Sequence, residues 1–163
     1  MSLFSFPTLV NERAARLVAG VVAASLAASI ALGQRWIVPV IAVGFLLRVA
    51  WGPKVSPLAR AAVALAGRLG EPKLVAGAPK RFAQGIGAVC TIAATALHAV
   101  GATVAAHAVV GVVVVCAGLE ASIAFCLGCW MFAQMQRAGL VAVDVCVDCA
   151  PASARRGRVG TAG

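Results

Sequence analysis

The sequence has no tyrosine and few charged residues of either sign. Five acidic residues occur among 163, and all charged residues together make up 12% of the chain, against 62% hydrophobic residues. The hydrophobic residues form runs of about 20, the length that crosses roughly 30 Å of hydrocarbon. This composition argues against a soluble domain and predicts a polytopic membrane protein.

The motifs of common soluble enzymes are also missing. The sequence contains no glycine-rich phosphate loop, no Ser-His-Asp set and no pair of catalytic carboxylates, and Gly85-Ile86-Gly87 lies inside an apolar run. The net charge of +9 would suggest nucleic acid in a soluble protein. Because the basic residues lie beside the apolar runs, membrane orientation explains them better. No nucleic-acid partner is expected.

Four apolar runs predict an all-α fold, a bundle of four transmembrane helices embedded in the lipid bilayer. Asn11 is suited to cap the first helix and Glu12 to lie in its first turn. The second run is short, but Arg48 can extend its side chain to the nearby interface. The fourth run is longer than a bilayer requires, so it must tilt or emerge. The predicted spans are 14–33, 37–51, 82–101 and 106–132.

A basic loop with four prolines, residues 52–81, separates the second and third spans. Within it Ser56-Pro57 is a suitable helix start, and Leu58, Ala62 and Leu65 fall on one side at helical spacing. Residues 57–69 are therefore predicted to form a short amphipathic helix in the headgroup region. The alternative is an ordinary loop helix packed on the bundle.

Lysine and arginine gather at one end of the predicted bundle, whereas the opposite end has only Arg35. Because basic loops stay on the cytoplasmic side, both termini are expected to be cytoplasmic and the protein to lie in the cell membrane as a multi-pass protein. The chain then divides into a membrane domain, 1–140, and a cytoplasmic tail, 141–163, whose basic end is predicted to be disordered.

Two Cys-x-x-Cys pairs are the group in the chain most suited to chemistry. Cys126 and Cys129 end the last apolar run, and Cys146 and Cys149 follow in the tail, so that the spacing is C-x2-C-x16-C-x2-C. A cytoplasmic location disfavours a permanent disulfide and favours either a transient redox dithiol or a metal site. The spacing suits a zinc site with four thiolate ligands, so the expected cofactor is none or, in the metal interpretation, zinc.

The first pair is expected near the C-terminal end of a membrane helix. Two cysteines three residues apart share one face, within the range that a disulfide bridges. A helix C-terminus disfavours thiolate, so these thiols would lack the N-terminal placement that activates a thioredoxin-like cysteine. The alternative is that Cys126 and Cys129 are two small packing residues without chemistry.

Glu120 is the other candidate site residue, because an ionisable group inside a span is expected to be functional. It could accept protons from the cysteines, or it could hydrogen-bond to Gln84, Thr91 or Ser122 and fix the helix packing. Cys90 and Cys116 are interpreted as packing residues.

Five segments of the sequence are distinctive: NERAAR (11–16), GFLLR (44–48), GPKVSPLAR (52–60), PKRFAQGIG (79–87) and FCLGC (125–129). Together they resemble the domain-of-unknown-function 4395 family. The resemblance implies a small integral membrane protein of a kind common in actinobacteria, encoded by genes often found near sulfurtransferase and thioredoxin-like genes. It implies no activity, but this association points towards sulfur or thiol metabolism.

The sequence thus favours a membrane thiol-redox or sulfur-relay protein that works with a cytoplasmic thioredoxin-like or sulfurtransferase partner. In this interpretation Cys146 and Cys149 receive the electrons or sulfur and Cys126 and Cys129 hold them. A small transporter of a sulfur oxyanion is the first alternative, and a zinc-clipped membrane scaffold is the second. A channel or transporter would need to form a homo-oligomer, for which the small residues Gly20, Ala24 and Ala28 of the first span offer a contact surface.

Overall fold

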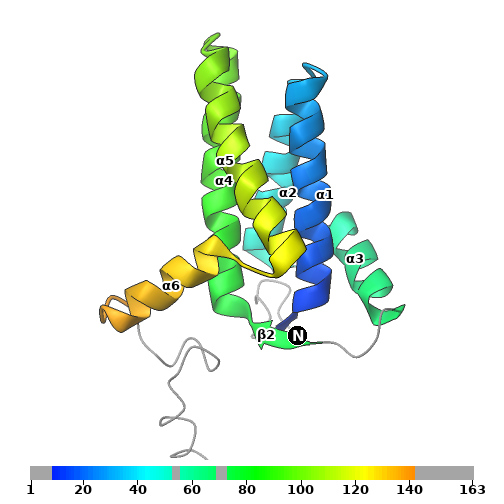
Figure 1. The fold of residues 1–163 in the computed structure, drawn as a ribbon, viewed down its shortest axis with the longest axis vertical. Coiled ribbons are helices and arrows are strands. Elements are labelled where there is room, and N and C mark those ends of the chain that lie inside the picture. Colours follow the sequence, from blue (N-terminus) through cyan, green and yellow to red (C-terminus); the bar gives the residue numbers. More distant parts are fainter. Residues whose placement is uncertain (1–8, 53–55, 69–72, 142–163) are drawn as a thin grey trace, which may run out of the picture.

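The computed structural model describes residues 9–52, 56–68 and 73–141 (Figure 1). Within these residues the chain is mostly helical, as predicted, and adds one pair of short strands. The elements are β1 (Leu9–Asn11), α1 (Glu12–Ala31), α2 (Ile37–Trp51), α3 (Pro57–Arg68), β2 (Leu74–Ala76), α4 (Gly77–Ala99), α5 (Thr103–Ile123) and α6 (Leu127–Arg137).

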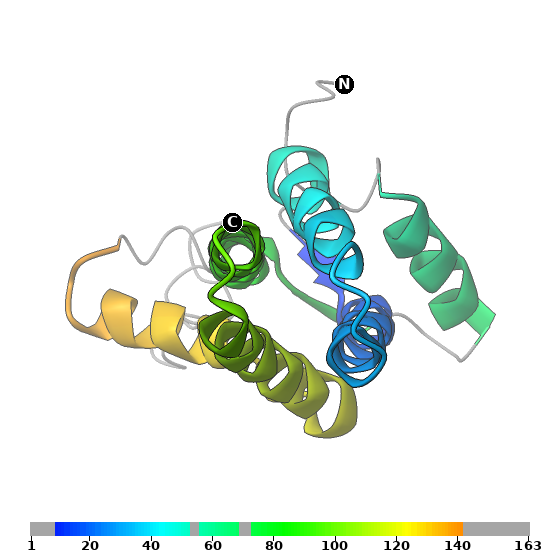
Figure 2. The same cartoon turned by 90° about the horizontal axis from the view of Figure 1, so that it is seen from above.

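Four of these helices form the bundle. The chain rises through α1, returns through α2, rises again through α4 and returns through α5, while α3 and α6 lie on opposite sides of it (Figures 1 and 2). Helix α1 packs mainly on α5, and α2 packs mainly on α4. Buried aliphatic side chains from all four helices meet in one core, which contains Val22, Leu26, Val38, Ala94 and Val110.

Three helices, α1, α4 and α5, are long and apolar enough to cross a membrane, and α2 is a shorter apolar helix of 15 residues. Large apolar side chains also point outward from the bundle, which would be costly in water but suits a lipid environment. Examples from the four helices are Val21, Val40, Val43, Val89, Ile92, Val112 and Val115.

The first two helices begin as predicted. The side chain of Asn11 accepts a hydrogen bond from the backbone N–H of Arg13 at 3.0 Å, so it caps α1, and Glu12 lies in the first turn. Arg48 differs from its prediction, because it is only 3% exposed and lies over the Phe45 ring, 4.7 Å from the centroid. Its side chain is therefore packed inside the bundle.

Strands β1 and β2 were not predicted. They pair antiparallel, with Leu9 opposite Ala76 and Asn11 opposite Leu74. Each strand is three residues long, too short to show the alternation that identifies a strand in a sequence. The pairing joins the start of α1 to the start of α4, so both helices leave the same end of the molecule.

Helix α3 lies where the amphipathic helix was predicted, and its buried face is only partly the predicted one. Ala62 of the predicted face is buried and packs with Ala66 on Ala14 of α1, whereas Leu65 is 50% exposed. Small side chains allow a closer approach of two helices than leucine does. Helix α3 is thus packed on the bundle through alanines, with Val63 and Leu65 exposed.

The prediction of one continuous helix over 106–132 is wrong. Helix α5 ends at Ile123, Ala124 adopts a left-handed conformation with φ of 59°, and α6 begins at Leu127 in a new direction (Figure 1). The guanidinium of Arg16 donates hydrogen bonds to the carbonyls of Ala121 at 3.0 Å and Ser122 at 2.8 Å. These contacts satisfy carbonyl groups at the end of α5, which is why the helix can stop there.

Candidate thiol site

The break after α5 places the first cysteine pair at the start of a helix instead of the end of one. Cys126 is the N-cap of α6, with an extended backbone, and Cys129 lies in the first turn. The expectation that these thiols lie at a helix C-terminus is therefore wrong. At a helix N-terminus the partial positive charge favours a thiolate, which is the placement that activates cysteines in disulfide exchange.

Gly128, between the two cysteines, lets α6 approach α4. A Cβ atom at position 128 would lie 2.6 Å from the Cα atom of Ala83, so no other residue fits without moving the backbone. Further along the same contact, the rings of Phe82 and Phe132 pack with centroids 5.6 Å apart. The close approach of the two helices fixes the position of the cysteine pair against the first turns of α4.

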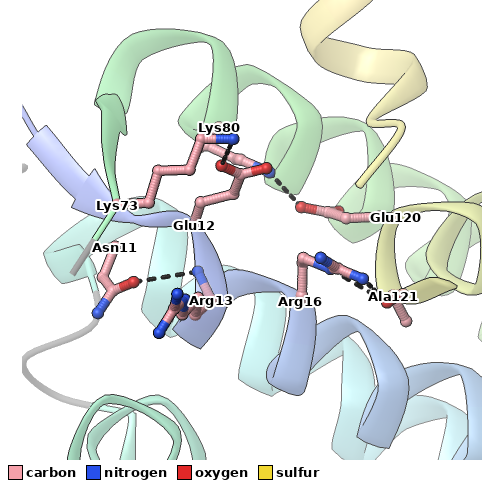
Figure 3. A network of polar contacts seen from close by, with 8 residues as sticks. All are labelled: Asn11, Glu12, Arg13, Arg16, Lys73, Lys80, Glu120 and Ala121. Atoms are coloured by element: carbon pink, nitrogen blue, oxygen red, sulfur yellow. Dashed lines mark hydrogen bonds and ion pairs between the residues drawn. The ribbon is translucent and has the colours of Figure 1, made fainter. Parts of the chain in front are cut away.

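Glu120 forms an ion pair with Lys80, and both side chains are largely buried (Figure 3). Lys80 comes from the first turns of α4 and Glu120 from the last turn of α5, so the pair joins the two helices just before the cysteines. The other partners considered for Glu120 bond elsewhere: Thr91 to the carbonyls of its own helix, and Ser122 to the carbonyl of Gly118.

Lys80 is a site residue that the sequence analysis missed, because it was assigned to the basic loop. Helix α4 begins at Gly77, five residues before the predicted start. Pro79 was the available signal, since proline is common in the first turn of a helix and Lys80 follows it directly.

The two thiols have different proton affinities. A hydrogen bond from the Cys129 thiol lowers the pKa of Cys126, and the positive charge of Lys80 acts in the same direction, against burial and the charge of Glu120. The pKa of Cys129 is raised, because its proton is held in that hydrogen bond and because the thiol is buried beside Cys126. Cys126 is therefore the better nucleophile, and Cys129 keeps its proton.

Two hollows meet at Cys126. One is open on the surface beside β2 and is lined by Glu12, Lys80, Cys126 and Cys129. The other is a largely apolar cavity of about 160 Å³ between the bundle helices, which also reaches Lys80 and Cys126. Cys126 thus borders both the surface hollow and the bundle interior.

The other candidate residues are placed as follows. Cys90 and Cys116 are half-buried free thiols that line the internal cavity. Cys146 and Cys149 lie outside the described residues. Among residues 9–52, 56–68 and 73–141, no three His, Cys, Asp or Glu side chains come together as metal ligands. Any zinc site of the predicted kind would need the second pair.

Replacing Lys80 by glutamine is expected to raise the pKa of Cys126, because a positive charge that favours the thiolate is removed. Alkylation of Cys126 at pH 7 should slow on the order of tenfold, while the rate reached at high pH stays unchanged. Mass spectrometry of the alkylated peptide across a pH series measures both quantities. Lys73→Gln is the control, since Lys73 pairs with Glu12 on the surface and is 71% exposed. A fall of the high-pH rate as well would mean that Lys80 acts only on the structure.

Comparison with known proteins agrees with the resemblance noted in the sequence. No curated protein and no solved structure matches the chain. The model of one protein family, described as a domain of unknown function (DUF4395), matches residues 10–137. The match covers every helix described above, the cysteine pair at α6 and the Lys80–Glu120 ion pair, and the chain therefore belongs to the DUF4395 family.

Proposed function

We propose that the protein is a membrane thiol–disulfide or sulfur-relay protein in which Cys126 is the attacking thiol and Cys129 the resolving thiol. The observation that carries this proposal is the position of Cys126 at the N-terminus of α6, beside Lys80, at the edge of a surface hollow. Its partner is a soluble thioredoxin-like or sulfurtransferase protein on the cytoplasmic side. The second pair, Cys146 and Cys149, would exchange with the first.

Four membrane spans and a cytoplasmic site fit this proposal. Because β1 pairs with β2, helices α1 and α4 start at the same end, and α2 has to cross back between them. Its 15 residues cover only about 22 Å, a shortfall that local thinning of the bilayer accommodates. The end that holds the thiol site is basic, which supports a cytoplasmic orientation. Its basic residues include Arg13, Arg16, Arg60, Arg68, Lys73, Arg81 and Arg137.

The exchange step balances as follows. The Cys126 thiolate attacks one sulfur of a partner disulfide, forming a mixed disulfide and releasing one partner thiolate. Cys129 then loses its proton to the Lys80–Glu120 pair and attacks the sulfur of Cys126, which forms the Cys126–Cys129 disulfide and releases the second partner thiolate. In the reverse direction the same two bonds are broken and formed. For a sulfur relay, the Cys126 thiolate instead attacks the outer sulfur of a partner persulfide, which breaks the partner's S–S bond, leaves Cys126 as the persulfide and releases the partner thiolate.

Thiol trapping in intact membranes tests the proposal. A permeant alkylating reagent is applied before and after a reductant, and before and after a chelator, and each cysteine is followed by mass spectrometry. We expect Cys126 and Cys129 to become reactive only after the reductant, or to carry an added sulfur atom. Cys90 and Cys116 serve as internal references, since they should respond to neither treatment.

The alternatives give different results in the same experiment. A zinc-clipped scaffold predicts that the chelator alone exposes the thiols at 126, 129, 146 and 149. A sulfur-oxyanion transporter with structural cysteines predicts that all four react without either treatment and that solute uptake survives Cys126→Ser. Both results would contradict the proposed exchange.

A further inference from the structure

The internal cavity has a lining that is apolar except around a few side chains. Its wall comes from all six helices and from Val10 of β1. It reaches from Cys126 along α5 to Val112, whose side chain is 59% exposed, so the cavity is not fully enclosed on that side. Its volume of about 160 Å³ resembles that of an engineered apolar cavity of roughly 150 Å³ that binds benzene. The cavity can therefore take one six-membered ring at the level of the thiol site.

Two of the residues that line the cavity each carry a buried polar atom without a hydrogen-bond partner. One is the Nε–H donor of Arg48, a side chain only 3% exposed, and the other is the acceptor Oε1 of Gln84. An unpaired buried polar atom costs free energy, so most such atoms in proteins have a partner. An unpaired donor and an unpaired acceptor on residues that line one cavity point to a ligand that has both an acceptor and, in one of its states, a donor.

We propose that this cavity binds a lipid-soluble quinone, and that the Cys126–Cys129 dithiol reduces it. This inference rests on the proposed thiol–disulfide function and names its membrane-side substrate. The apolar wall surrounds the ring, the Nε–H of Arg48 donates to a quinone carbonyl, and a hydroxyl of the quinol donates to Oε1 of Gln84. A lipid acyl chain would fill the same space but leave both polar atoms unpaired.

The electrons and protons of this step balance. The dithiol loses two electrons and two protons as the S–S bond between Cys126 and Cys129 forms. The quinone takes up both electrons and two protons, and its two carbonyls become hydroxyls. Lys80 and Glu120 line the cavity together with Cys126, and this ion pair can pass the protons. Because substituted benzoquinones are stronger oxidants than protein disulfides, electrons flow from the dithiol to the quinone.

Binding is tested first, in a form that is independent of redox turnover. In the full chain with Cys126→Ser and Cys129→Ser, Cys90 and Cys116 remain as reporters in the cavity wall. Decylubiquinone, whose ring carbons are all substituted, should protect both from a small permeant maleimide. Arg48→Met and Gln84→Leu should each raise the concentration needed for protection by about tenfold, the effect of one hydrogen bond.

The matched control for these variants is Gln134→Leu, a glutamine of α6 outside the cavity lining. In this variant decylubiquinone should protect Cys90 and Cys116 at the same concentration as in the parent protein. Dodecanol at the same concentration should give no protection. Equal protection by dodecanol and by the quinone, or unchanged protection in both cavity variants, would overturn the proposed site.

Turnover of the quinone is tested next in the protein with both Cys-x-x-Cys pairs intact. Under argon, the reduced protein should convert decylubiquinone to quinol with one Cys126–Cys129 disulfide formed for each quinol. Arg48→Met should slow this reaction about tenfold, yet form the disulfide normally with diamide, a soluble oxidant. If diamide forms the disulfide and the quinone neither protects nor oxidises, the quinone inference fails and the proposed function stands. If diamide forms no disulfide in the parent protein, the proposed function itself fails.

Discussion

Replacing Cys129 by serine should leave the chain able to attack a partner but unable to finish the exchange. Cys146 and Cys149 are replaced by serine in all variants of this experiment, so that the second pair cannot release the partner. Cys126 then stays joined to the partner as a mixed disulfide, because no second thiol in α6 releases it. Replacing Cys126 by serine should abolish the adduct, since the thiol with the lowered pKa is removed. Non-reducing electrophoresis of membranes quenched with acid, followed by mass spectrometry, measures the adduct.

Cys90→Ser in the Cys129→Ser background is the control for this trapping experiment. Cys90 lies inside the bundle on α4, so its loss should leave the adduct unchanged. If Cys126→Ser accumulates as much adduct as Cys129→Ser, the roles of the two thiols assigned here are wrong. If neither variant yields an adduct while the parent protein cycles between thiol and disulfide, the exchange does not use α6.

Replacing Gly128 by alanine should have a large effect for the addition of a single methyl group. The added Cβ would meet the backbone of Ala83, and α6 would have to move away from α4. Forcing an extra methyl group into such a contact costs about 1–3 kcal/mol. The movement would also separate Cys126 from Lys80. Unfolding by denaturant in detergent should give the lower stability, and alkylation at pH 7 the lower Cys126 reactivity.

Gly85→Ala is the matched control, because no atom lies within 4 Å of a Cβ at that position of α4. Alanine there should keep or slightly raise stability, since it is the better helix former. Gly128→Ala with the stability and Cys126 reactivity of the parent protein would mean that α6 is not held against α4 in this way.

Hydropathy predicted most of the helices of the bundle, because the ends of a long apolar run in the sequence lie close to the ends of the helix it forms. The predicted span 37–51 has the bounds of α2, and the first span lies within two residues of α1. The start of α4 was predicted too late because Lys80 and Arg81 looked like loop residues. Charged residues lower the hydropathy of a helix end even when, as for Lys80, a partner on another helix neutralises them.

The break between α5 and α6 could not be predicted from local sequence. Residues 119–132 contain no proline, and the one glycine, Gly128, lies after the break and serves a different purpose. The helix stops because Arg16, more than a hundred residues earlier, binds its last carbonyl groups. A contact of this range has no signature in the neighbouring residues, so the cysteines were assigned to the wrong end of a helix.

The contact between Arg16 and the end of α5 also orders events during synthesis. The first helix leaves the ribosome long before Ala121 and Ser122 are synthesised, so the guanidinium of Arg16 has no carbonyl partners there until α5 is complete. Until α5 packs against α1, its end lacks the contacts with Arg16, and the helix can continue through the cysteines, which then have no helix N-terminus to activate them. We therefore expect the thiols of the nascent protein to be less reactive, and Cys126 to become reactive only when α5 has docked against α1.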